Sequence, residues 1–118
     1  MTREWAEEFA HDWIDSWNSH DLPRILSHYT EDFEMSSPFI PSFSGDPSGM
    51  LRGKAQVGAY WQAALERFPD LKFEFFEVFV GADSITIYYK SVMDKLATEI
   101  FFFNEDGKAY KAFAHYNG

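Results

Sequence analysis

The sequence predicts an α+β fold in which three N-terminal helices pack on one face of a curved antiparallel sheet. Apolar residues recur with helical spacing in the first half of the chain, whereas the chain after Leu71 is dominated by aromatic and β-branched residues. Hairpin-type turn residues separate these later runs. The 118 residues contain no internal repeat and no linker-like segment, so we expect residues 1–118 to form one domain.

The first expected helix carries an apolar stripe. Trp5, Phe9, Trp13 and Trp17 recur every four residues, and acidic residues occupy the opposite face. This spacing is typical of an amphipathic helix that packs its stripe against a core.

Two further helices are indicated by their start and stop signals. Asp21 is an N-cap candidate, and Pro23 suits the first turn of the short helix that follows. Residues 57–68 place apolar side chains at i, i+3, i+4 and i+7 until Pro69 ends the pattern. A short strand over residues 33–36 is expected between these two helices.

The segment of residues 38–53 is rich in Pro, Ser and Gly, so we expect a loop without regular structure. It keeps several apolar side chains, which is typical of a loop that covers something. Beyond it, four strands are expected at residues 71–80, 85–92, 98–103 and 109–116. Hairpin turns between them predict an antiparallel meander.

Composition excludes several classes of function. Ten Lys and Arg against nineteen Asp and Glu give a formal net charge of −9, which argues against nucleic acid and against an anionic membrane as partners. Without cysteine there is no disulfide, thiolate zinc site or Cys nucleophile, and the four His lack metal-ligand spacing. No run approaches the length of a membrane span, and the charged N-terminus does not resemble a signal peptide, so we expect a cytoplasmic protein with no metal and no cofactor.

The strand pattern predicts a hollow in the sheet. Ala112 and Ala114 share one row of the last strand with Tyr110 and Tyr116, and Glu99 lies in the strand alongside. Close packing of the two Ala against a helix is one interpretation of this row. The other is a ligand pocket, since few polar groups among aromatic side chains are typical of such sites.

Both faces of the later strands carry large apolar side chains, which a sheet with one wet face does not show. The second face therefore needs a cover. We expect a homodimer that packs through the sheet, because closed homodimers are the commonest oligomers.

Several short motifs follow one another along the chain. They are WNSHDL at 17–22, Tyr29, EDF at 31–33, SP at 37–38, LRGK at 51–54, FPDL at 68–71 and FNEDGK at 103–108. In this order and spacing the chain resembles the SnoaL-like branch of the nuclear transport factor 2-like superfamily. The resemblance implies a cone-shaped, cystatin-like roll with a pocket at its wide end, and frequent homodimers. Members include polyketide cyclases, ketosteroid isomerase, dehydratases, epoxide hydrolases and binding proteins without catalysis, so the fold alone does not give the reaction.

The resemblance carries three positions onto this sequence. Ser37 matches the carboxylate base of ketosteroid isomerase, and a hydroxyl cannot be that base unaided. Trp13 matches the isomerase's helix tyrosine and can donate only through its indole N–H. Glu99 matches the isomerase's neutral carboxylic acid, and we expect burial to raise its pKa. Epoxide hydrolases need an Arg on a strand, and none lies on the strands expected here.

Two hypotheses remain open from the sequence. In the first, the protein binds a small, largely apolar, aromatic or polycyclic molecule, and Glu99 gives or takes a proton in isomerase, cyclase or dehydratase chemistry. The expected walls of the pocket are Trp13, Trp17, Met35, Ser37, Trp61, Tyr88, Phe101, Ala112 and Tyr116. In the second, the protein is a non-catalytic dimeric interaction module whose hollow is filled by side chains.

Overall fold

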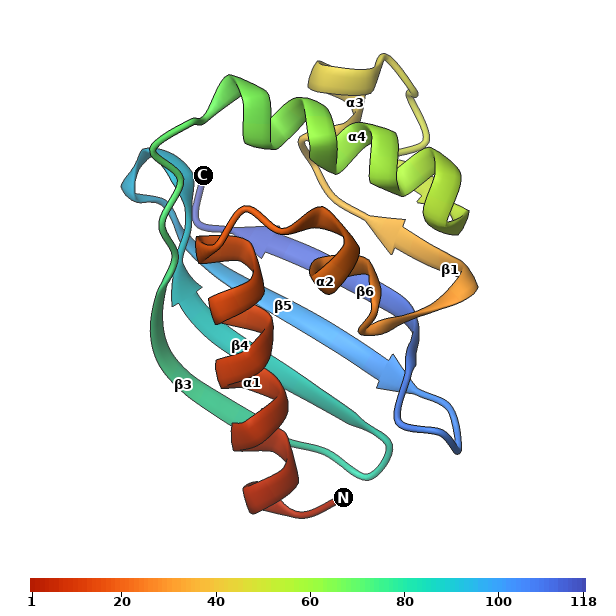
Figure 1. Ribbon diagram of the computed structural model, residues 1–118, viewed down its shortest axis with the longest axis vertical. Coiled ribbons are helices and arrows are strands. Elements are labelled where there is room, and N and C mark those ends of the chain that lie inside the picture. The colour runs from red at the N-terminus through yellow and green to blue at the C-terminus, as the bar shows by residue number, and fades with distance from the viewer.

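Helices cover the concave face of a six-stranded sheet in the computed structural model, which describes residues 1–118 (Figure 1). The strands are β1 (Tyr29–Ser36), β2 (Met50–Arg52), β3 (Glu74–Val80), β4 (Ser84–Lys90), β5 (Leu96–Phe103) and β6 (Ala109–Tyr116). The helices are α1 (Arg3–Asn18), α2 (Leu22–Leu26), α3 (Ile40–Ser44) and α4 (Gly53–Arg67), with one 3₁₀ turn, η1 (Val92–Asp94). The predicted α+β class is confirmed.

The strand order is β2-β1-β6-β5-β4-β3, and β3 to β6 form the expected antiparallel meander. β1 pairs antiparallel with β2 but parallel with β6. The prediction of antiparallel pairing therefore holds for every neighbouring pair except β1 and β6. The parallel pair brings the N-terminal half of the chain beside its last strand.

The aromatic stripe of α1 forms the centre of the core. Phe9 packs edge-to-face on Phe101 and Phe103 of β5, with ring centroids 5.1 and 4.9 Å apart. Trp13 contacts Phe101 and Tyr89 in the same way, at 5.3 Å in both cases. Edge-to-face aromatic pairs add to the stabilisation from buried apolar area, so this stripe fixes α1 across the sheet.

The helix starts follow the expected chemistry. The Thr2 hydroxyl accepts the Trp5 N–H at 3.1 Å and caps α1. The Asp21 carboxylate accepts the Arg24 N–H at 3.2 Å and caps α2, in which Pro23 occupies the first turn. These side chains satisfy backbone N–H groups that have no partner within the helix.

The segment of residues 38–53 contains more regular structure than predicted, because α3 and β2 form within it. Pro41 lies in the first turn of α3, where the missing N–H of proline costs no hydrogen bond. Gly45 ends the helix with φ of 81°, a conformation that favours glycine. The fully buried Ile40 anchors α3 to the core.

Two irregularities of the sheet shift elements from their predicted places. β1 starts at Tyr29, four residues earlier than predicted, and its register against β6 shifts between Tyr29 and Glu34. A second shift lies between Phe102 and Phe103, so that Ala109 faces the core and Tyr110 is exposed. The placement of Tyr110 in the inner row of the last strand is therefore wrong, because a bulge reverses the alternation of side chains.

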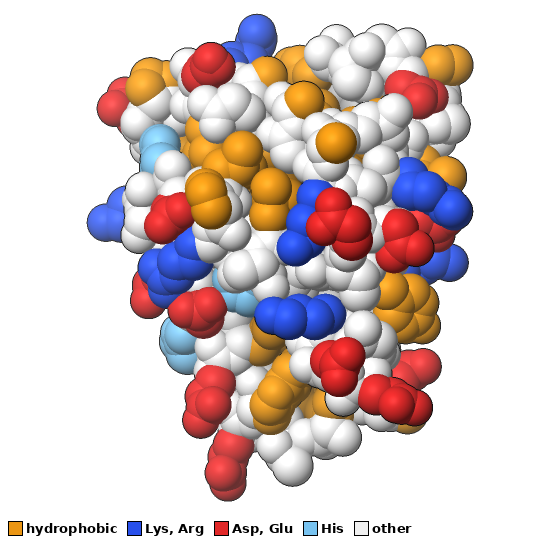
Figure 2. Space-filling view, turned by 45° about the vertical axis from the view of Figure 1, so that its right-hand side comes forward, with side chains coloured by type: hydrophobic (Ala, Val, Ile, Leu, Met, Phe, Trp, Pro, Cys, Tyr) orange, Lys and Arg blue, Asp and Glu red, His pale blue; other side chains and the backbone are white.

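Charged side chains of both signs are interspersed over the face shown in Figure 2. Some form ion pairs, such as Arg3 with Glu77 at 2.8 Å. No helix combines the length and the hydropathy needed to cross a bilayer.

Asn18, the last residue of α1, joins the helix to the chain that enters β3. Its Oδ1 accepts the Phe73 N–H at 2.6 Å, and its Nδ2 donates to the Phe73 carbonyl at 3.0 Å. The side-chain amide thus pairs with Phe73 as a neighbouring strand would.

Replacing Asn18 by Ala removes both hydrogen bonds and leaves two partly buried backbone groups without partners. We expect the free energy of unfolding to fall by about 1–3 kcal/mol. Urea unfolding would measure the loss, with Ser19→Ala as the matched control, since the exposed Ser19 hydroxyl bonds only within α1 and its cap. An equal effect of the two substitutions would contradict a role of Asn18 in holding β3.

Candidate functional site

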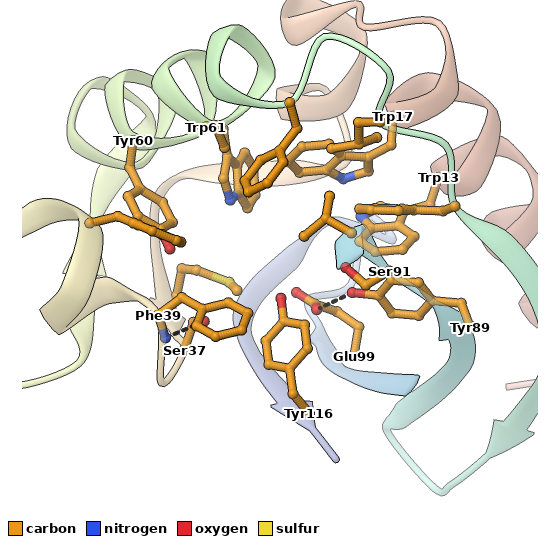
Figure 3. Close-up of a pocket in the computed structure, with 17 residues that line it drawn as sticks. Trp13, Trp17, Ser37, Phe39, Tyr60, Trp61, Tyr89, Ser91, Glu99 and Tyr116 are labelled. Atoms are coloured by element: carbon orange, nitrogen blue, oxygen red, sulfur yellow. Dashed lines mark hydrogen bonds between the residues drawn. The ribbon is translucent and has the colours of Figure 1, made fainter. Parts of the chain in front are cut away.

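A cavity of about 70 Å³ lies between the helices and the concave face of the sheet (Figure 3). Fourteen of its 17 lining residues are hydrophobic. Three tryptophans form its helical side, Trp13 and Trp17 from α1 and Trp61 from α4. Each was expected in the pocket from the sequence.

The strands supply the remaining predicted residues that reach the cavity. Met35 lines it from β1, Glu99 from β5 and Tyr116 from β6, and Ser37 lines it just after β1. β1 and β6 lie side by side, so residues far apart in the sequence meet on one wall.

Three residues expected in the pocket lie elsewhere. Tyr88 points to the outer face of the sheet, where its ring lies 5.1 Å from that of Phe76. Phe101 and Ala112 face inward and are fully buried, but they are paired with each other further along the sheet, under Phe9 and Trp13. They belong to the core below the cavity.

The sequence interpretation missed lining residues from several regions, which are Phe39 and Phe43 around α3, Tyr60 and Ala64 of α4, Phe68, Leu71 and Phe73 before β3, Tyr89 of β4, and Ser91 and Val92 after it. In β4 the cavity is lined by Tyr89, which shares the inner row with the buried Ile85 and Ile87. The two isoleucines at alternate positions indicate from the sequence that this row of β4 faces the core. The α3 region contributes Phe39 and Phe43, consistent with the expectation that the apolar side chains of residues 38–53 cover something.

Glu99 is the only acidic or basic side chain in the cavity wall, and it is 2% exposed. The Tyr89 hydroxyl donates to its Oε1 at 3.3 Å, and its other oxygen points toward the cavity (Figure 3). Burial raises the pKa of Glu99 from 4.5 to about 8, because the charged form loses its hydration and finds no cation nearby. At neutral pH the side chain is therefore mainly a neutral carboxylic acid.

The tyrosines around the cavity stay protonated. Burial raises the pKa of Tyr60 to about 12, and it raises the pKa values of Tyr89 and Tyr116 above their usual range. A negative charge on Glu99 would raise them further. These hydroxyls can donate or accept hydrogen bonds near neutral pH but cannot act as phenolate bases.

The polar groups of Trp13 and Ser37 are used within the fold. The Trp13 indole N–H donates to the buried Tyr29 hydroxyl at 2.9 Å. The Ser37 hydroxyl accepts the Phe39 N–H at 3.2 Å (Figure 3). The donor of Trp13 is therefore occupied, and the Ser37 hydroxyl keeps its own O–H but is no carboxylate base. Glu99 alone can exchange a proton in the cavity near neutral pH.

No group of three or more His, Asp or Glu side chains is arranged to hold a metal ion. His28 lies away from the cavity, where its Nε2 is 2.6 Å from Asp12 and its Nδ1 is 3.0 Å from the Ile25 carbonyl. It ties α1 to the end of α2.

A surface groove of about 590 Å³ adjoins the cavity. The two share Phe43, Tyr60, Ala64 and Phe68 in their linings, so these side chains separate them. Phe43 is 43% exposed, and the Arg67 guanidinium lies 5.0 Å from its ring centroid. Phe43 is thus the most exposed of the four side chains that separate the cavity from the groove.

The profile of the SnoaL-like domain family matches residues 10–114 of the chain. The crystal structure of a SnoaL-like protein of unknown function from Burkholderia thailandensis E264 is 52% identical, with a TM-score of 0.96 over 99% of this chain and 98% of that one. Comparison with curated proteins gave no match.

More distant solved structures share the fold. A protein from Agrobacterium tumefaciens strain C58, provisionally named an isomerase of the SnoaL-like family, has 15% identity and a TM-score of 0.75 over 96% of this chain and 97% of that one. A protein from Sinorhizobium meliloti, provisionally named a polyketide cyclase, has 14% identity and a TM-score of 0.73 over 92% and 94%. At such identities the likeness concerns the fold alone. The family profile and the 52% identical structure cover nearly the whole chain, and on these grounds the protein belongs to the SnoaL-like domain family.

Proposed function

We propose that the protein binds a small, largely apolar ring compound in the cavity and that Glu99 exchanges a proton with a polar group of that compound. The observation that carries this proposal is a buried carboxylic acid with one oxygen facing an apolar hollow. The chemistry it supports is acid/base isomerisation, cyclisation or dehydration, which needs no metal or cofactor. The relatives provisionally named isomerase and polyketide cyclase are compatible with this class of reaction.

The environment of Glu99 suits proton transfer. A general acid or base works best when its pKa lies near the working pH, and burial brings the pKa of Glu99 to about 8. In its neutral form the carboxyl donates to a carbonyl oxygen, which polarises the carbonyl and favours an enol. With no other carboxyl or imidazole in the wall, the same group would have to give its proton to one atom of the compound and take a proton from another.

The size of the cavity limits the ligand. Its volume of about 70 Å³ equals roughly that of two water molecules in the liquid and is below the ~150 Å³ of an engineered cavity that accepts benzene. Even a compound of one ring therefore needs more room than the cavity has, and it would have to move the half-exposed Phe43 aside. A polycyclic compound would have to displace Phe43 and extend into the adjoining groove.

The alternative of a non-catalytic module with a filled hollow does not account for Glu99. A hollow that served only packing would be better filled by an apolar side chain, since a buried carboxyl reduces stability. Residues that reduce stability within an otherwise apolar core are expected at functional sites.

We also propose that two copies of the chain pack through their sheets. The outer face of the sheet carries an aromatic patch, which consists of Phe76, Phe79, Tyr88, Ile100, Phe102 and Phe113. Phe79 is 56% exposed, and the others are exposed or half-buried in the single chain. Contiguous exposed apolar surface of this kind marks interaction sites, and a second copy offers a matching surface.

A thermal-shift panel of one-ring ketones and phenols tests the ligand proposal. A compound that binds the folded protein at 100 times its dissociation constant should add about 2.7 kcal/mol of stability and raise the melting temperature by several degrees. For a ketone, affinity should weaken as the pH rises through about 8 in the wild type, because Glu99 loses the proton that it donates. This pH dependence should vanish in Glu99→Gln and persist in the control Glu66→Gln, which changes an exposed side chain on α4. A panel without any shift would count against the proposal.

The pH dependence of stability should report the buried acid directly. Below about pH 4.5 Glu99 is protonated in both the folded and the unfolded chain, and between about 4.5 and 8 only the unfolded chain releases the proton. The free energy of unfolding should therefore fall as pH rises through this window, by up to roughly 1.4 kcal/mol per pH unit relative to Glu99→Gln. Above about pH 8 the difference should level off. Urea unfolding from pH 5 to 9 would show it, and parallel curves for the two proteins would mean that Glu99 is not buried as described.

The dimer proposal predicts that Ile100→Lys yields a monomer, because it places a charge in the middle of the aromatic patch. Ile100 lies between Thr86 and Phe113 across the sheet. Size-exclusion chromatography with light scattering would give the mass of each protein. Glu66→Lys is the control, since it changes the charge on α4, and it should remain dimeric. A wild-type monomer at micromolar concentration would refute the proposal.

A further inference from the structure

Trp17 holds the one buried side-chain polar atom of the protein that has no hydrogen-bond partner, its indole Nε1. The residue is 5% exposed and lies in the cavity wall. Figure 3 shows the nitrogen on the edge of the ring that faces the cavity, with Glu99 on the opposite side.

Such an unpaired donor is unusual, because nearly all buried polar groups in proteins have a partner. The ring of Trp17 is held on several sides, by Trp13 at 6.3 Å, Trp61 at 5.3 Å and Phe73 at 5.3 Å between ring centroids. It is therefore not free to turn its N–H toward another group of the protein. The neighbouring Trp13, one turn earlier, does have a partner in the Tyr29 hydroxyl.

We propose that the Trp17 N–H is a ligand-binding donor and that the ligand carries a hydrogen-bond acceptor at the end away from Glu99. This inference rests on the proposed function, since it requires that the cavity take a ligand. Beyond the proposed function, it states where the ligand carries a polar atom and which residue binds that atom.

Trp17 and Glu99 set what the ligand must carry, because the hydroxyls that also line the cavity can either donate or accept. An indole N–H can only donate, and a protonated carboxyl facing the cavity also offers a donor. A ligand that satisfies both has oxygen acceptors on two sides of a small ring. Ring compounds with carbonyl oxygens meet this requirement. A hydrocarbon would leave the Trp17 N–H unpaired, and an ammonium group cannot accept a hydrogen bond from it.

The first test follows the indole N–H signals of the four tryptophans by ¹H–¹⁵N NMR at pH 6.5. The probes are cyclohexane-1,4-dione and 4-methylenecyclohexanone, which have nearly the same shape. Both have a carbonyl oxygen for Glu99, but only the dione has a second acceptor on the opposite side. We expect the dione to move the Trp17 signal downfield and 4-methylenecyclohexanone to leave it without that shift. The Trp13 signal is the internal control, because the Trp13 ring lines the same cavity while its N–H is already bonded to Tyr29.

The second test compares dissociation constants of the two probes for the wild type and for Trp17→Phe. The alkene gains more from leaving water, so the informative quantity is the change in the ratio of the two constants. We expect the preference for the dione to fall about tenfold in Trp17→Phe, which corresponds to the loss of one hydrogen bond. Trp13→Phe should change the ratio much less.

The outcomes separate this inference from the proposed function. If both probes bind and neither the Trp17 signal nor the ratio distinguishes them, the cavity takes ligands but Trp17 is not the donor. A shift of the Trp61 signal alone, specific to the dione, would have the same meaning. If neither probe binds the wild type, the proposed function fails and this inference fails with it. The NMR test uses the wild type, so it remains decisive if Trp17→Phe does not fold.

Discussion

The packing of the α1 aromatic stripe on the concave face of the sheet is the interaction on which the rest of the structure depends. Phe9 and Trp13 meet the aromatic side chains of β5 and close the core at one end. Trp17, one turn further on, meets Trp61 of α4 instead of the sheet. The two helices thus leave a space between their tryptophans and the strands, and the cavity forms there. One helical stripe therefore produces both the core and the site.

The same packing explains why an acid in this place behaves differently from the acids of the surface. Glu99 is one residue among the inward-facing positions of β5, and its neighbours across the sheet are Ile87 and Ala114. Neither can pair with a charge, and the only protein hydrogen bond that reaches the carboxyl comes from Tyr89. The formal net charge of −9 counts Glu99 as ionised, whereas the folded protein holds it neutral at neutral pH. The fold accepts a cost in stability at this position, as proteins do where a function requires it.

The sequence predicted the elements well where periodicity determines them and less well where the backbone departs from it. The stripe of α1 and the meander of β3 to β6 follow from side-chain spacing alone. The prediction for Tyr110 is wrong because a bulge opposite Phe103 reverses the inward and outward alternation of side chains in β6. No local residue pattern indicates this bulge. The prediction places Tyr88 in the cavity, whereas Tyr89 lies there. Both rows of β4 hold an aromatic side chain, and only Ile85 and Ile87, which share a row with Tyr89, identify that row as the buried one. Phe43 could not be predicted in the wall, because the place of α3 depends on how Ile40 packs in the folded chain.

Membership of the family does not transfer the roles of its catalytic residues to this chain. At the position of the isomerase's tyrosine, Trp13 directs its donor into the core. At the position of the base, the hydroxyl of Ser37 is bound to the backbone of Phe39. The cavity donors that cannot be replaced by a rotating hydroxyl are instead Trp17, which the resemblance did not mark, and the protonated Glu99, which it did. A site with these two donors and no resident base favours molecules that accept hydrogen bonds, and any proton it moves must travel through Glu99. The chemistry of this protein therefore follows from which polar groups its own packing leaves unpaired.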